Sequence, residues 1–217
     1  MAAHAPSALR ARRAALLRGI YVILNEGEQV VKRGTSVVNA GVRVVQYRAK
    51  GGVNAMHLGA LRRLTRAHEA LLILNDDWAA GLAFDCDGVH VGPHDAGFDA
   101  VATVRDAMPH GLIGLSCGTP DEVRRANSQS VDYLGIGSVY ATASKSDAGP
   151  PIGIEGLRAL ARLSRAPVAA IGGINGERLC EIRATGVAMA AVIGAVEMAR
   201  DAGNAAQDLI ARWNSAA

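Results

Sequence analysis

The sequence predicts an α/β fold, a single-domain TIM (β/α)8 barrel, and two observations support this class. Short apolar runs alternate with amphipathic segments eight times along the 217 residues, without a linker or a break in composition. This alternation implies parallel strands joined by helices, and eight such units in about 200 residues suit a closed barrel. The alternative is a doubly wound open sheet. It normally carries a glycine-rich fingerprint after its first strand, where this chain has Asn25-Glu26-Gly27.

Each strand is predicted where a short apolar run stops at glycine or polar residues. The predicted strands are 21–24, 42–47, 71–74, 88–91, 112–115, 133–136, 168–171 and 189–193. Helices are predicted where apolar residues recur at helical spacing, as Leu58, Leu61 and Leu64 do, or where a cap precedes proline, as in Thr119-Pro120. The predicted helices are 28–39, 55–70, 78–84, 98–108, 120–127, 154–164, 177–184 and 205–213.

Two regions are expected along the chain. Residues 1–19 form an N-terminal extension that is rich in alanine and arginine and has no acidic residue. A transit peptide has a similar composition, but a helix leading into the first strand is the preferred interpretation. Residues 20–217 form the TIM-barrel catalytic domain.

Composition narrows the class of protein. The net charge of +3 comes from interspersed charges of both signs, which gives no reason to expect a nucleic acid partner. No apolar run approaches the length of a membrane span, so no membrane partner is expected. Cys86, Cys117 and Cys180 are widely spaced without a CxxC motif, which favours a reduced, cytoplasmic setting. A homo-oligomer is compatible with these properties.

The run Leu71 to Asp77, LLILNDD, is central to the predicted site. Its apolar half reads as a buried strand, and its polar half then lies at the strand's C-terminal end, where parallel α/β folds bind ligands. Asp76 and Asp95 follow neighbouring strands and are predicted to share one Mg2+, which commonly takes one or two carboxylates. The alternative is that Asn75 and Asp76 only cap the next helix.

Cationic and hydroxyl groups follow other strands. Gln46, Arg48 and Lys50 alternate, so an extended chain puts them on one face, suited to phosphate or diphosphate oxygens. The alternative is a solvated basic strand end. The polar loop 137–151 after the sixth strand offers two hydroxyls and a cation, and long loops in compact domains are often binding loops. These loop residues are Thr142, Ser144 and Lys145.

Glycines at the last two strand ends predict a second anion site. Gly172-Gly173 and Ile193-Gly194 let backbone N–H groups approach a phosphate, as TIM barrels often do after strands seven and eight. Ser116 ends the fifth strand. The mouth thus has two anion sites, which fit two phosphorylated substrates or one bisphosphate.

These residues together resemble the thiamine-phosphate synthase family. The resemblance runs in order and spacing from Tyr21 to the last helix. It rests on the segments GVRVVQYRAK, LILNDDW, DGVHVGPHD, GLSCGT, DYLGIGSVYATASK, GIEGLRAL and AAIGGIN and on the end of strand eight. It implies a TIM barrel that joins 4-amino-2-methyl-5-hydroxymethylpyrimidine diphosphate to a thiazole phosphate. The products would be thiamine phosphate and pyrophosphate.

The resemblance also implies roles for the predicted site residues. Gln46, Arg48, Lys50, Asn75 and Lys145 would hold the diphosphate, and Asp76 and Asp95 would bind Mg2+. Ser116 would contact the pyrimidine, while Thr142, Ser144, Gly173, Ile193 and Gly194 would contact the thiazole phosphate. Arg48, Lys50, Lys145 and Ser116 would be the catalytic residues, and pyrophosphate would leave before the thiazole nitrogen attacks.

The chain departs from the family pattern at three places. Leu24-Asn25 stands where the family usually has Thr-Asp, Pro93-His94 replaces Gln-Glu, and Ala141 replaces a proline of the loop. Two other classes compete with the synthase. A thiazole tautomerase shares the barrel but needs no diphosphate site, and a non-catalytic phosphate-binding regulatory barrel would be expected to lose a metal carboxylate or Lys145. Both conflict with the residues retained here.

Overall fold

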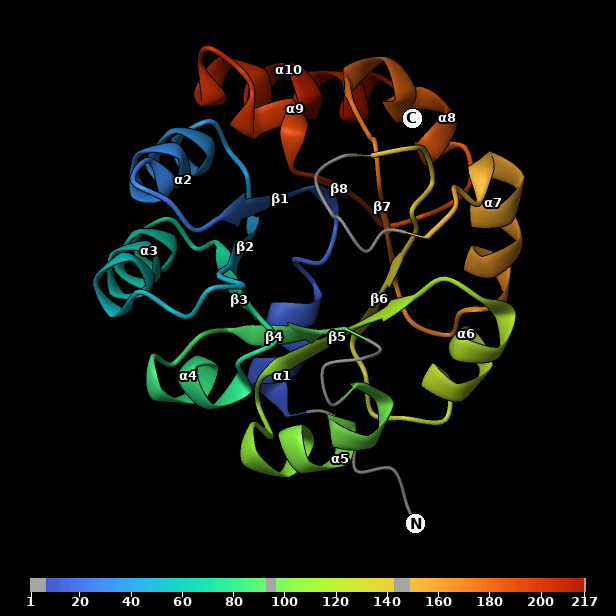
Figure 1. Cartoon of the computed structure of the whole chain (residues 1–217), viewed down its shortest axis with the longest axis horizontal. Helices are drawn as coiled ribbons and strands as arrows, with labels where there is room; N and C mark the ends of the chain where they lie inside the picture. Colours follow the sequence, from blue (N-terminus) through green and yellow to red (C-terminus); the bar gives the residue numbers. More distant parts are fainter. Residues whose placement is uncertain (1–6, 93–96, 143–148, 217) are drawn as a thin grey trace.

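The computed structural model describes residues 7–92, 97–142 and 149–216. Its strands close into one parallel barrel in the order β1 to β8, and helices surround the barrel (Figure 1). The predicted TIM barrel is therefore confirmed. The strands are β1 Gly19–Asn25, β2 Val44–Arg48, β3 Leu71–Asn75, β4 Gly88–Val91, β5 Leu112–Cys117, β6 Tyr133–Ile136, β7 Val168–Ile171 and β8 Met189–Val192.

The helices follow the prediction with local differences. They are α1 Ala8–Ala14, α2 Val30–Asn39, α3 Ala55–Ala67, α4 Trp78–Ala83, α5 Gly97–Ala107, α6 Pro120–Ala126, α7 Gly153–Leu163, the 3-10 turn η1 Gly176–Arg178, α8 Leu179–Arg183, α9 Gly194–Glu197 and α10 Ala202–Ser215. The sequence did not predict α9, because four residues barely complete one helical turn and so show no periodicity. α10 begins three residues earlier than predicted, because Asp201 caps it by accepting the N–H of Asn204.

Side chains alternate between the barrel interior and the layer under the helices. On β2, Val44 packs with the interior cluster, whereas Val45 and Tyr47 pack with the outer one. The same alternation turns Gln46 and Arg48 inward, toward the cavity of the mouth.

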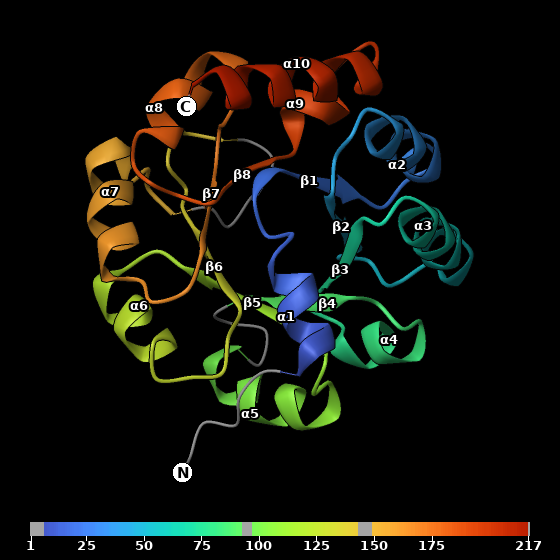
Figure 2. The ribbon, with the colours of Figure 1, turned by 180° about the vertical axis from the view of Figure 1, so that it is seen from behind.

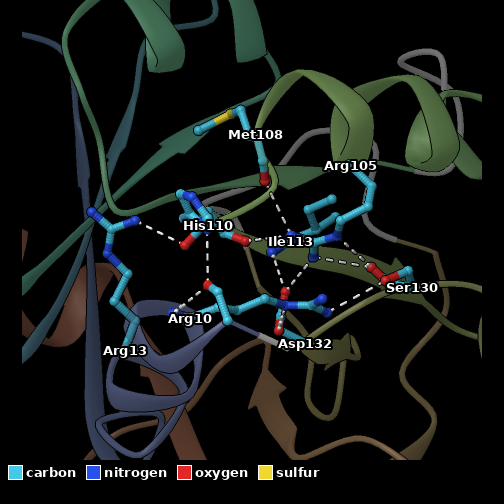
Figure 3. A network of polar contacts seen from close by, with 10 residues as sticks. Arg10, Arg13, Arg105, Met108, His110, Ile113, Ser130 and Asp132 are labelled. Atoms are coloured by element: carbon cyan, nitrogen blue, oxygen red, sulfur yellow. Dashed lines mark hydrogen bonds and ion pairs between the residues drawn. The ribbon is translucent and has the colours of Figure 1, made fainter. Parts of the chain in front are cut away.

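Helix α1 covers the N-terminal end of the barrel (Figure 2). Leu17, which follows it, belongs to the interior cluster, and Ala14 and Leu16 pack against that cluster. Arg10 Nε donates to Asp132 Oδ1 at 2.7 Å, and Arg105 Nη2 donates to Asp132 Oδ2 at 2.6 Å (Figure 3). Asp132 is thus a buried hub that fastens α1 to the barrel.

Asp87 repeats this arrangement two strands away. Asp132 accepts the N–H of Ile113 in β5 at 2.8 Å, and Asp87 accepts the N–H of Leu72 in β3 at 3.0 Å. Asp87 also pairs with Arg13 of α1 at 3.1 Å.

Because α1 closes the N-terminal end of the barrel, the opposite end, seen in Figure 1, is left for ligands. Across the described ranges, no helix is long and apolar enough to cross a membrane.

Candidate active site

A cavity of about 650 Å³ opens at the C-terminal ends of the strands. Residues from the ends of β2, β3 and β5 and from the segments after β6, β7 and β8 line it together. The predicted site residues in its lining are Gln46, Arg48, Lys50, Asn75, Ser116, Thr142, Gly173, Ile193 and Gly194. The fold therefore brings both predicted anion sites into one space.

The other predicted residues are placed differently. Ser144, Lys145 and Asp95 lie outside the described residues. Asp76 is described but is not among the residues that line the cavity. Lys50 Nζ donates to Asp76 Oδ2 at 2.7 Å, and the Asn75 amide donates to the same oxygen.

The alternative prediction for this segment, that Asn75 and Asp76 cap the next helix, is wrong. Asp77, and not Asn75 or Asp76, caps α4, since Asp77 Oδ1 accepts the N–H of Ala80 at 2.9 Å. Asp76 instead has a left-handed φ of 64°, and its N–H donates to the His90 carbonyl at 2.9 Å. Asp76 is thereby freed from capping and held beside β4.

The Asp76 carboxylate is the kind of group that binds a hard cation. Its carboxylate already faces one positive charge, the Lys50 ammonium, and carboxylate oxygens are the ligands that Mg2+ prefers. Within the described ranges, no three His, Cys, Asp or Glu side chains gather into a metal-binding cluster. The second predicted carboxylate, Asp95, is not in those ranges. A site for Mg2+ at Asp76 is thus compatible with the donor set and stays a prediction.

Arg48 is held from the side by a neighbouring strand. Its Nη1 donates to Asn25 Oδ1 at 3.0 Å, and the Asn25 amide donates to Glu197 Oε2 at 2.8 Å. The sequence identified Asn25 only as a departure from the family pattern and missed Glu197. Glu197 lies on α9, which the sequence did not predict, so no nearby sequence pattern indicates that Glu197 belongs to the site.

A chain of polar groups crosses the barrel interior below the mouth. Gln46 Nε2 donates to Tyr21 Oη at 2.6 Å, and the Tyr21 and Tyr133 hydroxyls lie 2.9 Å apart. The Tyr133 hydroxyl lies 3.0 Å from His90 Nδ1, and His90 Nε2 lies 2.9 Å from Ser116 Oγ. Burial raises the pKa of both tyrosines, so they stay neutral and hydrogen-bonded. Two predicted site residues are thus joined through residues that the sequence analysis did not assign.

The glycines after β7 belong to the predicted second anion site and have backbone conformations that few other residues adopt. Gly172 and Gly173 have φ of 105° and 63°, a region that favours glycine. A Cβ on Gly173 would lie 2.6 Å from the Ala141 carbonyl oxygen. Arg178 donates to the Gly173 carbonyl and stacks on the Tyr140 ring at 4.1 Å, which fixes the turn from outside.

Cys117 lines the cavity without being a nucleophile at neutral pH. Burial raises the pKa of its thiol to about 12. The cavity therefore contains polar binding groups and a neutral thiol but no activated cysteine.

A closed parallel barrel with a cavity at the strand C-termini is the architecture of a TIM-barrel enzyme, whose active site lies at this end of the barrel. The profile of the family described as thiamine monophosphate synthase matches residues 20–196. A thiamine-phosphate synthase of Archaeoglobus fulgidus is 42% identical over 176 residues, which are 80% of this chain and 81% of that protein. One of Moorella thermoacetica is 38% identical over 197 residues, 88% of this chain and 93% of that protein.

A solved structure agrees with these relatives. The thiamine phosphate pyrophosphorylase from Pyrococcus furiosus superposes with a TM-score of 0.81 at 33% identity, covering 92% of this chain and 97% of that one. The chain belongs to the thiamine monophosphate synthase family and is an enzyme of that family.

Proposed function

We propose that this enzyme joins 4-amino-2-methyl-5-hydroxymethylpyrimidine diphosphate to a thiazole phosphate, forming thiamine phosphate and pyrophosphate. Family membership supports thiamine-phosphate synthesis as the activity. The observation that carries the substrate assignment is that one shared cavity combines cations on one side with glycine backbone on the other. Two substrates with anionic groups at opposite ends of the reacting pair would fit this arrangement.

The diphosphate is assigned to the side formed by β2 and β3. Arg48 and Lys50 supply cations there, and Gln46 and Asn75 supply amide groups. Arginine and lysine both bind phosphate oxygens, arginine through its planar fork and lysine as a point charge. Lys145, from the loop after β6, is proposed to add a third cation.

The pyrimidine is assigned to the middle of the cavity and the thiazole phosphate to the far side. Ser116 Oγ, which His90 orients, is the proposed contact of the pyrimidine ring. Backbone groups of Gly173, Ile193 and Gly194 are the proposed phosphate contacts, with the hydroxyls of Thr142 and Ser144.

The proposed reaction needs no protein nucleophile. The bond between the exocyclic pyrimidine carbon and the diphosphate oxygen breaks first, and its electron pair leaves with pyrophosphate. The carbon becomes cationic and is stabilised by the aminopyrimidine. The thiazole nitrogen then donates its lone pair to that carbon. Arg48, Lys50 and Lys145 act on charge that grows on the leaving group, so they stabilise the transition state more than the ground state.

Magnesium is proposed as the cofactor. Asp76, with Asp95, would hold the ion on the diphosphate side, where the carboxylate of Asp76 already faces a cation. When bound, Mg2+ would neutralise part of the diphosphate charge. Lys50 would then exchange its contact with Asp76 for one with the diphosphate.

The test is the formation of thiamine phosphate from the two purified substrates, with Mg2+ and then with a chelator. We expect magnesium-dependent product and release of pyrophosphate. Arg48→Gln should lower kcat/KM by about 100-fold, the scale of losing one donor to developing negative charge. Arg43→Gln is the matched control, because Arg43 is an exposed arginine just before β2 and outside the cavity. Folded protein that bound the thiazole phosphate but made no product would instead support an isomerase or a regulatory barrel.

A further inference from the structure

We propose that Asn25 and Glu197 are positioning residues that hold the Arg48 guanidinium toward the diphosphate side of the cavity. The inference rests on the function proposed above and extends it to two residues outside the cavity lining. Both are half-buried, at the rim where the first and last strands of the barrel meet.

The hydrogen bonds among the three residues fix the amide of Asn25 in one orientation. Arg48 Nη1 donates to Asn25 Oδ1 at 3.0 Å, and Asn25 Nδ2 donates to Glu197 Oε2 at 2.8 Å. The Asn25 backbone N–H donates to Glu197 Oε1 at 2.6 Å, so both carboxylate oxygens are used. A guanidinium can only donate and a carboxylate can only accept, so the amide oxygen must face Arg48 and the amide nitrogen must face Glu197.

The three residues occupy the ends of neighbouring elements. Asn25 and Arg48 are the last residues of β1 and β2 and are register partners across the two strands. Glu197 ends α9, which directly follows β8, and β8 pairs with β1. The contact therefore runs from β8 through β1 to β2. Because α9 begins at Gly194, which lines the glycine side of the cavity, these hydrogen bonds also connect the glycine side to the cationic side.

The Asn25 amide lies between the Arg48 guanidinium and the Glu197 carboxylate and keeps these two charged groups apart. The carboxylate is held one residue away from the guanidinium, so it restrains Arg48 through Asn25 without a direct ion pair between them. Arg48 thus keeps donors available for an anion in the cavity. A long side chain that is already ordered loses less rotamer entropy when the anion binds, which favours affinity.

The test exchanges the charge between the two positions. In the single variant Asn25→Asp, two carboxylates face each other. In the single variant Glu197→Gln, two amide groups face each other. In the double variant, the new amide at position 197 would donate to the new carboxylate at position 25, which would still accept from Arg48. We expect each single change to raise the dissociation constant of inorganic pyrophosphate about tenfold, the scale of one charge-assisted hydrogen bond. The double variant should recover part of that loss but not all of it, because the hydrogen bonds are restored while Arg48 then faces a carboxylate directly. The KM for the thiazole phosphate should change little in each variant.

Pyrophosphate binding is measured by calorimetry with Mg2+, together with KM and kcat for each substrate and the melting temperature. Glu155→Gln is the matched control, because Glu155 is exposed on α7 and pairs only with its helix neighbour Arg158 in the described structure. Additive effects in the double variant, or lower melting temperatures with unchanged pyrophosphate affinity, would show that the pair only closes the barrel. Arg48→Gln separates the two proposals. If it leaves pyrophosphate binding intact, the diphosphate assignment itself fails.

Discussion

The Lys50 ammonium lies 2.7 Å from the Asp76 carboxylate. Lys50 follows β2 and Asp76 follows the neighbouring strand β3. The proposed function assigns Lys50 to the diphosphate and Asp76 to Mg2+. The pair lies at a partly exposed site, where such pairs add little stability. We therefore expect substitutions at this pair to change ligand binding more than folding.

Asp76→Asn should abolish most of the magnesium response. The amide keeps the size of the side chain but removes the charge that would hold the ion, so we expect turnover to fall about 100-fold. The measurement is the initial rate as a function of Mg2+ concentration. Asp77→Asn is the control, since asparagine also caps helices and should preserve α4. An unchanged magnesium curve for Asp76→Asn would remove Asp76 from the metal site.

Tyr133→Phe should lower stability and also weaken binding of the pyrimidine substrate, because Tyr133 belongs to the chain of hydrogen bonds that crosses the barrel interior. The change removes the hydroxyl between Tyr21 and His90, and a buried group left without its partner costs about 1–3 kcal/mol. Because His90 orients Ser116, we also expect a higher KM for the pyrimidine substrate. The control is Tyr47→Phe, whose hydroxyl donates to Glu26 outside the barrel interior. It should lower stability alone, as measured by urea unfolding and steady-state kinetics.

The buried thiols predict a loss of stability at alkaline pH. Burial raises the pKa of Cys86 and of Cys117 from 9.0 to about 12. The folded state thus retains protons that the unfolded state releases, so this contribution is full below about pH 9 and is lost as pH rises toward 12. The Cys86→Ala/Cys117→Ala double variant should flatten that slope in urea unfolding. Cys180→Ala, at an exposed position, should not.

Asp132→Asn should destabilise the barrel strongly. It leaves the guanidinium groups of Arg10 and Arg105 without their buried carboxylate, and breaking a buried pair on one side costs about 3–5 kcal/mol. The measurement is the free energy of unfolding in urea. Asp121→Asn removes an exposed pair with Arg124 and should cost about 0–1 kcal/mol. Equal losses for the two variants would mean that α1 is not fastened through Asp132.

Gly173→Ala should weaken binding of the thiazole phosphate. The new methyl group would meet the Ala141 carbonyl oxygen and the Tyr140 Cβ, so the turn that presents backbone N–H groups must shift. Gly186→Ala is the matched control. Gly186 also has a positive φ, 86°, but no atom lies within 4 Å of its added Cβ. A higher KM for the thiazole phosphate in both variants would point to backbone strain in general.

Local pattern was enough to predict the barrel and much of its mouth. Alternation along β2 predicts that Gln46, Arg48 and Lys50 share one face, and all three line the cavity. Parallel strands bring their C-terminal ends to one side, so most of the polar residues predicted at those ends meet there, although Asp76 does not line the cavity. These properties depend on neighbours in the chain, which a sequence shows directly.

Contacts between distant residues were decided by the tertiary structure alone. Nothing near Glu197 in the sequence indicates that its carboxylate binds Asn25, because that contact exists only once β8 closes on β1. The interior chain through Tyr133 and the fastening of α1 at Asp132 arise in the same way. The sequence by itself determined which groups reach the mouth, through strand periodicity. Barrel closure decided which groups hold them there, because a hydrogen bond requires two atoms within about 3 Å of each other and neither residue specifies that distance alone.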